Sequence, residues 1–207
     1  VILELKMVAH VGLIGLPNAG KSTLISSITG ARPKIAEYPF TTLQPVLGTI
    51  NLDDGRTIVI ADIPGIIQGA HEGIGLGLDF LRHIERTKML VYVIEISPYD
   101  PSTPAVTFKD LQHEIRHYDP SILNRPYLIA LNKSDFLDGT EERELALQIF
   151  REECPEIPAE QIFLISALNK DHTETLRQAI VETFFRQTAS SSPSKDSSQN
   201  HSPLHFF

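Results

Sequence analysis

The 207-residue chain has little of what several classes of protein require. It contains one cysteine, Cys154, which excludes a disulfide framework and a cysteine-based metal site and suits a reducing cytoplasm. No apolar run approaches the roughly 18–20 residues of a transmembrane helix, and no signal peptide is visible. The net charge is −8 with histidine neutral, so the surface as a whole is unsuited to clamping nucleic acid. We expect a cytoplasmic protein without a membrane span, and a monomer.

A phosphate-binding loop follows the first apolar run. Residues 15–22 read GLPNAGKS, which matches G-x-x-x-x-G-K-[ST] between a strand-like run at 11–14 and a helix-like segment. The glycines let backbone N–H groups turn toward phosphates, and the helix N-terminus adds its positive dipole end. Lys21 can reach the outer phosphates, and the Ser22 hydroxyl can ligate Mg²⁺. This context favours a nucleotide site over a chance match in a strand–turn–helix connector.

Segments typical of strands alternate with segments typical of helices. This alternation predicts an α/β fold with a mostly parallel, six-stranded sheet and helices on both faces. Asp54-Gly55 between the second and third strands predicts a hairpin, so one strand should run antiparallel at an edge. Strands are expected at 8–14, 46–52, 57–61, 89–96, 127–131 and 161–165, and helices at 21–29, 78–87, 108–118, 141–153 and 173–187.

One domain, expected over residues 8–187, accounts for most of the chain. Residues 1–7 are expected to be the remnant of a preceding domain or linker, because the chain lacks an initiator methionine and soon reaches its phosphate loop. Residues 188–207 are rich in serine and have no periodicity, so we predict a disordered tail. Residues 32–44 and 98–107 are expected to be loops, and a loop as long as the first is usually functional.

A second polar motif, Asn132-Lys133-Ser134-Asp135, closes the strand expected at 127–131. Ligands bind at this edge of open α/β sheets. The Asp135 carboxylate can accept from both N1–H and the 2-amino group of guanine, and adenine has neither donor, which disfavours ATP. Lys133 can lay its methylene stem along the base, and Asn132 can either brace the phosphate loop or reach base atoms. Backbone N–H groups of Ser166-Ala167-Leu168, after the next strand, could meet the guanine 6-oxo oxygen.

The metal and the γ-phosphate have their own candidate residues. Asp62 ends the strand expected at 57–61, the position of a Walker-B acid, and can hold Mg²⁺ through a water opposite Ser22. The Gly65 N–H can sense a γ-phosphate. Thr41 and Thr42 lie in the long loop, where a hydroxyl can complete the Mg²⁺ shell only while the γ-phosphate is present. These features predict two nucleotide-gated switch segments.

The residue that follows Asp-Ile-Pro-Gly is Ile66, where Ras-like proteins carry a glutamine that orients the attacking water. Isoleucine neither donates nor accepts hydrogen bonds, so a partner would supply a catalytic group or a bound K⁺ would supply charge. Asn18 would either help to ligate that K⁺ or brace the phosphate loop. For His71 local packing is favoured over a catalytic role, and the helical pair His113 and His117 has no evident third ligand for zinc.

With these motifs assembled, the chain resembles the G domain of the Obg (CgtA) family of translation-factor-class GTPases. The resemblance covers about residues 4–187. The Tyr-Pro-Phe-Thr-Thr loop is shared with related GTPases, whereas the stretch from GAHEG to RHIERT is specific to Obg. The matching stretches are VGLIGLPNAGKS at 11–22, ARPKIAEYPFTTL at 31–43, DIPG at 62–65, GAHEGIGLG at 69–77 and FLRHIERT at 80–87.

The resemblance implies a Ras-like P-loop NTPase fold, slow GTP hydrolysis with Mg²⁺, and fast GDP/GTP exchange. It also implies association with the large ribosomal subunit during its assembly and a link to the alarmone ppGpp. Thr42 rather than Thr41 becomes the Mg²⁺ ligand. The family's glycine-rich N-terminal domain, its expected ribosome-contacting part, and its usual C-terminal domain do not occur in these residues, so we expect poor ribosome binding. Gln68 and Leu78-Asp79 depart from the family pattern and could alter partner contacts.

The interpretation that the motifs favour is a GTPase that hydrolyses GTP to GDP and phosphate. Two alternatives remain: a guanine-nucleotide sensor whose main output is partner binding, and a P-loop small-molecule kinase, for which no lid or acceptor pocket is evident. Lys21, Thr42 and Gly65 are expected to be catalytic, and Ser22 and Thr42 to hold Mg²⁺, with Asp62 acting through water. The expected nucleotide-binding residues are Gly15, Leu16, Pro17, Asn18, Ala19, Gly20, Lys21, Ser22, Thr23, Phe40, Thr41, Thr42, Leu43, Gln44, Asp62, Ile63, Pro64, Gly65, Asn132, Lys133, Ser134, Asp135, Ser166, Ala167 and Leu168.

Overall fold

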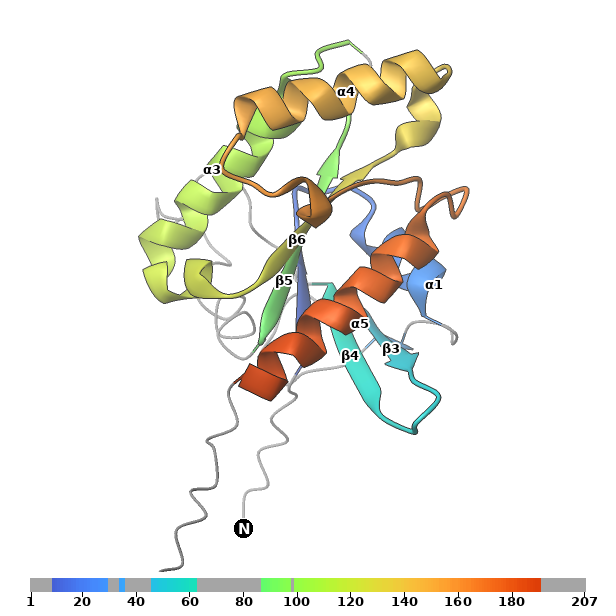
Figure 1. Cartoon of the computed structure of the whole chain (residues 1–207), viewed down its shortest axis with the longest axis vertical. Coiled ribbons are helices and arrows are strands. Elements are labelled where there is room, and N and C mark those ends of the chain that lie inside the picture. The colour runs from blue at the N-terminus through green and yellow to red at the C-terminus, as the bar shows by residue number, and fades with distance from the viewer. Residues whose placement is uncertain (1–8, 30–33, 36–45, 63–86, 98, 191–207) are drawn as a thin grey trace, which may run out of the picture.

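A twisted β-sheet runs through the middle of the computed structural model (Figure 1), which describes residues 9–29, 34–35, 46–62, 87–97 and 99–190. Its seven strands lie in the order β2-β3-β4-β1-β5-β6-β7. The apolar, β-branched segments predicted to be strands form it, as expected for a sheet covered on both faces. The strands are β1 (Val11–Ile14), β2 (Lys34–Ile35), β3 (Val46–Asn51), β4 (Thr57–Asp62), β5 (Met89–Glu95), β6 (Tyr127–Asn132) and β7 (Ile162–Leu164).

The sheet is mostly parallel. β4, β1, β5, β6 and β7 pair in parallel, and β3 runs antiparallel to β4 through the hairpin that Asp54-Gly55 predicts. Gly55 has φ 81°, a left-handed conformation that glycine adopts without strain. These features confirm the predicted mostly parallel sheet with one antiparallel strand. β2 was not predicted: it pairs with β3 from within the expected loop at 32–44. The sheet therefore has seven strands rather than six, and the antiparallel β3 is not at its edge, as was expected, because β2 lies outside it.

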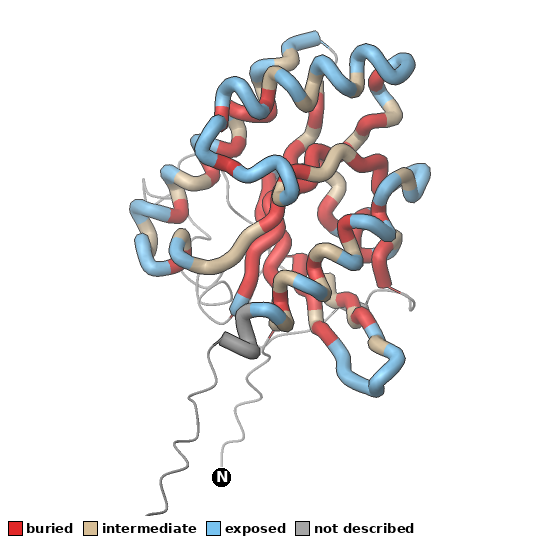
Figure 2. The backbone as a smooth tube through the Cα atoms, viewed as in Figure 1, coloured by how far each residue is buried: buried red, intermediate tan, exposed pale blue. Residues whose placement is uncertain are grey.

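Helices cover both faces of the sheet, as predicted (Figure 1). α1 (Lys21–Ile28) and α5 (Thr173–Ser190) pack on one face, and α3 (Thr103–Tyr118) and α4 (Thr140–Glu153) pack on the other. Alternate residues of β5 divide between the two cores, because successive side chains of a strand point to opposite faces. The central strands are accordingly buried along their length, and the helices expose their outer sides (Figure 2).

Aromatic side chains fill the core beneath α3 and α4. The ring of Tyr92 on β5 meets Phe108 edge-on at 5.0 Å and Tyr127 at 5.5 Å, and Phe108 lies 6.2 Å from Phe150. Such edge-to-face pairs add to the stabilisation from area burial. Cys154, directly after α4, is 0% exposed in the same core, and burial raises the pKa of its thiol.

Two helix boundaries differ from the predictions by more than one residue. α3 begins at Thr103, inside the expected loop at 98–107, because Pro104 occupies the first turn, where its missing N–H costs nothing. α5 runs to Ser190, three residues beyond its predicted end. Short 3₁₀ turns occur at Pro120–Asn124, Ser134–Phe136 and Ala159–Gln161. The helix expected at 78–87 falls, up to residue 86, outside the described residues, as do 1–8 and 191–207. None of the helices in the described ranges has the length and apolarity needed to cross a bilayer.

Candidate functional site

Polar side chains from distant parts of the chain meet at one edge of the sheet. The phosphate loop follows β1, Asp62 is the last residue of β4, and Asn132 is the last residue of β6. Because β1, β4 and β6 are parallel to the strands between them, their carboxyl ends lie together. The fold therefore unites the two predicted motifs, which stand more than a hundred residues apart in the sequence.

The shape of the phosphate loop depends on two glycines. A Cβ added to Gly15 would lie 2.2 Å from the Val93 carbonyl oxygen of β5, so the loop leaves β1 in a space that only glycine fits. Gly20 has φ 92° and caps α1, and its Cβ would meet the Asn132 amide at 2.3 Å. Asn18, at the exposed tip, also has a positive φ of 64°, which asparagine tolerates better than most residues.

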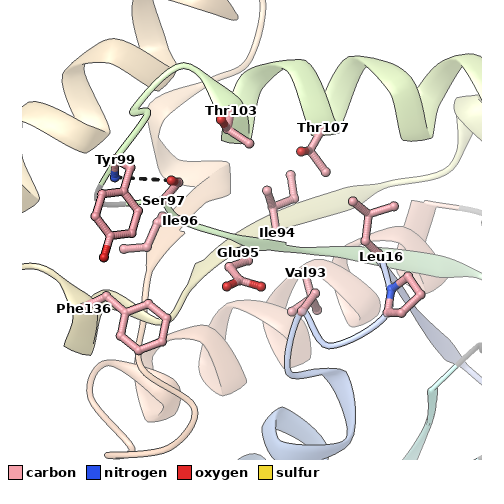
Figure 3. Close-up of a pocket in the computed structure, with 12 residues that line it drawn as sticks. Leu16, Val93, Ile94, Glu95, Ile96, Ser97, Tyr99, Thr103, Thr107 and Phe136 are labelled. Carbon is pink, nitrogen blue, oxygen red and sulfur yellow. Dashed lines mark hydrogen bonds between the residues drawn. The ribbon is translucent and has the colours of Figure 1, made fainter. Parts of the chain in front are cut away.

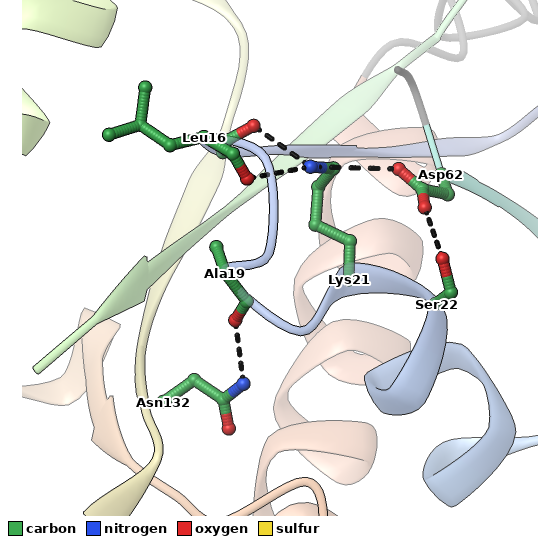
Figure 4. Close-up of polar contacts among 7 residues, drawn as sticks. Leu16, Ala19, Lys21, Ser22, Asp62 and Asn132 are labelled. Atoms are coloured by element: carbon green, nitrogen blue, oxygen red, sulfur yellow. Dashed lines mark hydrogen bonds and ion pairs between the residues drawn. The ribbon is translucent and has the colours of Figure 1, made fainter. Parts of the chain in front are cut away.

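Lys21, the first residue of α1, is folded back over the loop. Its Nζ donates to the carbonyl oxygens of Gly15 at 2.9 Å and Leu16 at 3.0 Å, and lies 3.9 Å from Oδ1 of Asp62 (Figure 4). Burial lowers the pKa of Lys21, and the Asp62 carboxylate opposes this shift. A buried ammonium held by neutral carbonyls at a helix N-terminus suits an incoming phosphate, which would replace those carbonyls as its partner.

Ser22 and Asp62 form the second polar contact of the loop. The Ser22 hydroxyl donates to Oδ2 of Asp62 at 2.6 Å, whereas Oδ1 of Asp62 is buried and has no hydrogen-bond donor (Figure 4). A buried carboxylate oxygen without a donor is costly unless a cation or water meets it. A hydroxyl beside a carboxylate is an oxygen set that Mg²⁺ accepts, so these two residues fit the ion that the motif predicts.

Asn132 ties the phosphate loop to the loop after β7. Its side-chain Nδ2 donates to the Ala19 carbonyl at 2.8 Å, and its Oδ1 accepts from the Ala167 N–H at 2.9 Å. The residue is 2% exposed. Of the two roles that the sequence left open for Asn132, the geometry has it bracing the loop, with both ends of its amide occupied by backbone groups.

Asp135 lies in the 3₁₀ turn that follows β6 and contacts the loop after β7. Its Oδ1 accepts from the Ser166 hydroxyl at 2.5 Å, and the Ser134 N–H donates to the Ile165 carbonyl at 3.0 Å. The carboxylate is thereby fixed next to the backbone of Ala167, the N–H of which Asn132 also orders. The backbone N–H groups of Ser166 and Ala167, predicted to meet a guanine oxygen, donate in this structure to the Asp171 carbonyl at 3.2 Å and to Oδ1 of Asn132. The contact of the Ser166 hydroxyl with Asp135 was not predicted.

A pocket of about 630 Å³ lies beside the phosphate loop. Figure 3 shows Leu16 of the loop and Glu95 of β5 in its wall, with Phe136 and Tyr99 at one end. The Glu95 carboxylate is 2.7 Å from Nζ of Lys133, across the end of β6. No role was predicted for Glu95, although an acid that closes the otherwise apolar strand 89–95 was a usable signal.

The remaining predicted residues divide into those that the structure describes and those outside the described ranges. Thr23, Ser134 and Leu168 lie at this edge, and Leu168 is 72% exposed. His113 and His117 lie on exposed α3 surface with their Nε2 atoms 3.1 Å apart. Of the residues singled out in the sequence, those that the structure does not describe are Phe40, Thr41, Thr42, Leu43, Gln44, Ile63, Pro64, Gly65, Ile66, Gln68, His71 and Leu78-Asp79.

Comparison with known proteins gives consistent matches. Residues 10–133 match the family model described as "50S ribosome-binding GTPase". The chain is 51% identical over 180 residues to GTPase Obg of Protochlamydia amoebophila, covering 87% of this chain and 52% of that protein. It is 50% identical over 178 residues to GTPase Obg of Crocosphaera subtropica, covering 86% and 50%. The chain thus spans about half the length of these curated relatives.

Solved structures share the fold at lower sequence identity. Aquifex aeolicus Era bound to GDP·AlF₄⁻ superposes with a TM-score of 0.62 at 24% identity, covering 86% of this chain and 57% of that one. A GTP-binding protein from Sulfolobus solfataricus in complex with GDP gives a TM-score of 0.65 at 24% identity, covering 86% and 53%. The G domain of the Thermotoga maritima FeoB iron transporter gives 0.57 at 20% identity, covering 84% and 98%.

Proposed function

This chain belongs to the 50S ribosome-binding GTPase family and corresponds to the G domain of its Obg members, and we propose that it hydrolyses GTP to GDP and phosphate with Mg²⁺. One observation carries the proposal. Asn132 joins the phosphate loop at Ala19 to the loop after β7 at Ala167. The neighbouring Ser166 hydroxyl holds the Asp135 carboxylate, so the phosphate loop and this carboxylate are connected through one set of hydrogen bonds. A guanine nucleotide is the ligand whose two ends suit these groups.

The phosphate end has three tasks. Lys21 and the N–H groups at the start of α1 stabilise negative charge on the phosphates. Ser22 and Asp62 would hold Mg²⁺, with Asp62 acting through water, and the bound ion would supply positive charge opposite the phosphate oxygens. Thr42 and Gly65, from the two switch segments, are proposed to respond to the γ-phosphate.

Turnover is proposed to be slow. Ile66 follows the Asp-Ile-Pro-Gly segment and has no polar group to orient water. A partner would supply the group that assists attack by water, or a K⁺ near Asn18 would supply positive charge. On the family resemblance, the partner is the large ribosomal subunit during assembly, and ppGpp competes for the nucleotide site. The matched residues make up only about half of these relatives, so the relatives' further segments would supply much of the ribosome contact.

Calorimetry with GDP, GTP, ppGpp and ATP tests the nucleotide assignment. We expect the three guanine nucleotides to bind and ATP not to bind. Asp135→Asn should lower GTP affinity at least about a hundredfold, because the amide can no longer accept from both guanine donors. Glu156→Gln, an exposed change in the turn that follows α4, is the matched control. Unchanged GTP affinity in Asp135→Asn would falsify the guanine assignment.

The absence of a polar side chain at Ile66 also favours the sensor alternative. The two functions differ in what ribosomal subunits do to GTP turnover, measured as released phosphate. Strong stimulation by large subunits supports a gated enzyme, whereas nucleotide-dependent binding without stimulation supports a sensor. Phosphate transferred to an acceptor other than water would contradict both and indicate a kinase.

A further inference from the structure

Glu95 has a defined place at the guanine end of the site. Within the sheet it pairs with Asn132, and the Ile96 N–H donates to the Asn132 carbonyl at 3.0 Å. The strand β5 therefore ends level with β6, immediately before Lys133. Lys133 has φ 70°, a left-handed conformation that turns the chain and its side chain back across the end of β5.

The two side chains meet as an ion pair. Nζ of Lys133 lies 2.7 Å from Oε2 of Glu95 and 5.7 Å from the centre of the Phe136 ring. The Lys133 side chain is 24% exposed and the Glu95 side chain 43% exposed, so the contact is only half in water. The four-carbon stem of Lys133 is thus anchored at both ends, by the backbone and by the carboxylate.

We propose that Glu95 is a positioning residue for guanine-nucleotide binding, which acts by holding the Lys133 stem as a flat support for the base. The inference rests on the proposed function. Lys133 lies two residues before Asp135, so its stem can cover a face of a base whose edge Asp135 holds. A free lysine would lose rotamer entropy on adopting one conformation. The ion pair fixes that conformation beforehand, which slows nucleotide release.

Glu95 lies in the wall of the pocket beside the phosphate loop, so one side of its carboxylate faces solvent (Figure 3). Leu16 and Phe136 flank Glu95 there, which limits how many waters can screen the carboxylate. The pair remains open enough for salt to weaken it. Nucleotide release from the intact protein should therefore depend on ionic strength through Glu95.

The test measures dissociation of a fluorescent GDP analogue from the full chain. Glu95→Gln should accelerate release about two- to fivefold, the range of a half-exposed ion pair. Glu95→Asp, which keeps the charge, should release the analogue more slowly than Glu95→Gln but faster than the unmodified chain. In a Lys133→Met background, where the stem remains without its charge, Glu95→Gln should have no further effect. Glu153→Gln, which breaks the exposed pair with Lys109, is the matched control and should leave release unchanged.

A salt series gives a second measurement on the same proteins. Raising NaCl should accelerate release from the unmodified chain more than from Glu95→Gln. The inference is wrong if Glu95→Gln releases the nucleotide at the original rate, or if it accelerates release equally in the Lys133→Met background. Failure of the unmodified chain to prefer GDP over ADP would instead contradict the proposed function, which the inference requires.

Discussion

At the scale of single residues, the site is made by close backbone approaches as much as by polar groups. Gly15 leaves no room for a side chain against the Val93 carbonyl of β5, and this contact sets how the phosphate loop departs from the sheet. Gly55, in the β3–β4 hairpin, is glycine for another reason: its φ is 81° and nothing lies within 4 Å of an added Cβ. Gly15 is therefore required because a side chain does not fit, and Gly55 because of its backbone conformation.

Gly15→Ala should therefore abolish nucleotide binding and destabilise the fold by about 2–4 kcal/mol, because the loop or β5 must move to relieve the overlap. Gly55→Ala should cost about 1 kcal/mol through backbone strain alone and leave nucleotide affinity intact. Urea unfolding and GDP titration of both variants measure the two effects. Normal GDP affinity in Gly15→Ala would show that the loop tolerates displacement.

At the scale of elements, His10 joins β1 to β4 and α5. Its Nδ1 accepts from the Val59 N–H at 3.0 Å, and its ring lies 5.3 Å from Phe184. Burial, and then the Lys88 charge, lower the pKa of His10 below 6.5. Since the unfolded chain takes up this proton at higher pH than the folded protein, the free energy of unfolding must fall as the pH drops through and below 6.5.

Replacement of the histidine tests this dependence. His10→Asn keeps an acceptor near the Nδ1 position but does not titrate, so its stability should decline less between about pH 7.5 and pH 5.5. Urea unfolding at several pH values gives the comparison. Asn124→Ala, an exposed change that removes no titrating group, serves as the control and should follow the unmodified chain. An identical slope in His10→Asn would exclude His10 as a source of acid destabilisation.

At the scale of the whole molecule, Asn132 connects parts of the chain that are 113 residues apart. Asn132→Ala would leave the Ala19 carbonyl and the Ala167 N–H without their buried partner, a loss of roughly 2–4 kcal/mol in stability. Both the phosphate and the base loops should loosen, so the rise in melting temperature on adding GDP should also shrink. Asn124→Ala, at an exposed position, is the control for thermal unfolding with and without GDP.

How far the sequence could predict this structure depends on how local each feature is. The strand–loop–helix around Lys21, the Asp54-Gly55 hairpin and the two-faced burial of β5 follow from motifs and periodicity, which are local. β2 does not, because two residues become a strand only through their register with Val46 and Leu47. The start of α3 was predicted too late in the sequence, because proline interrupts most helices yet fits a first turn.

The candidate site divides in the same way. Lys21, Ser22 and Asp135 could be proposed from motifs, because phosphate, metal and guanine each demand particular atoms at fixed spacing, and the structure places all three residues at one edge of the sheet. The pairing of Glu95 with Lys133 could not be proposed in this way, since it arises from two parallel strands that end at the same level. Geometry at a sheet edge is a property of the assembled sheet, and no single segment encodes it.

The buried Cys154 makes the chain convenient for spectroscopy. It is the sole cysteine in the sequence, it is 0% exposed, and burial raises the pKa of its thiol, so little reactive thiolate forms. A cysteine introduced at Tyr99 or Leu168, which are 96% and 72% exposed, would react alone with a maleimide dye. Fluorescence at either position could then follow nucleotide exchange in real time, with no background thiol to remove first.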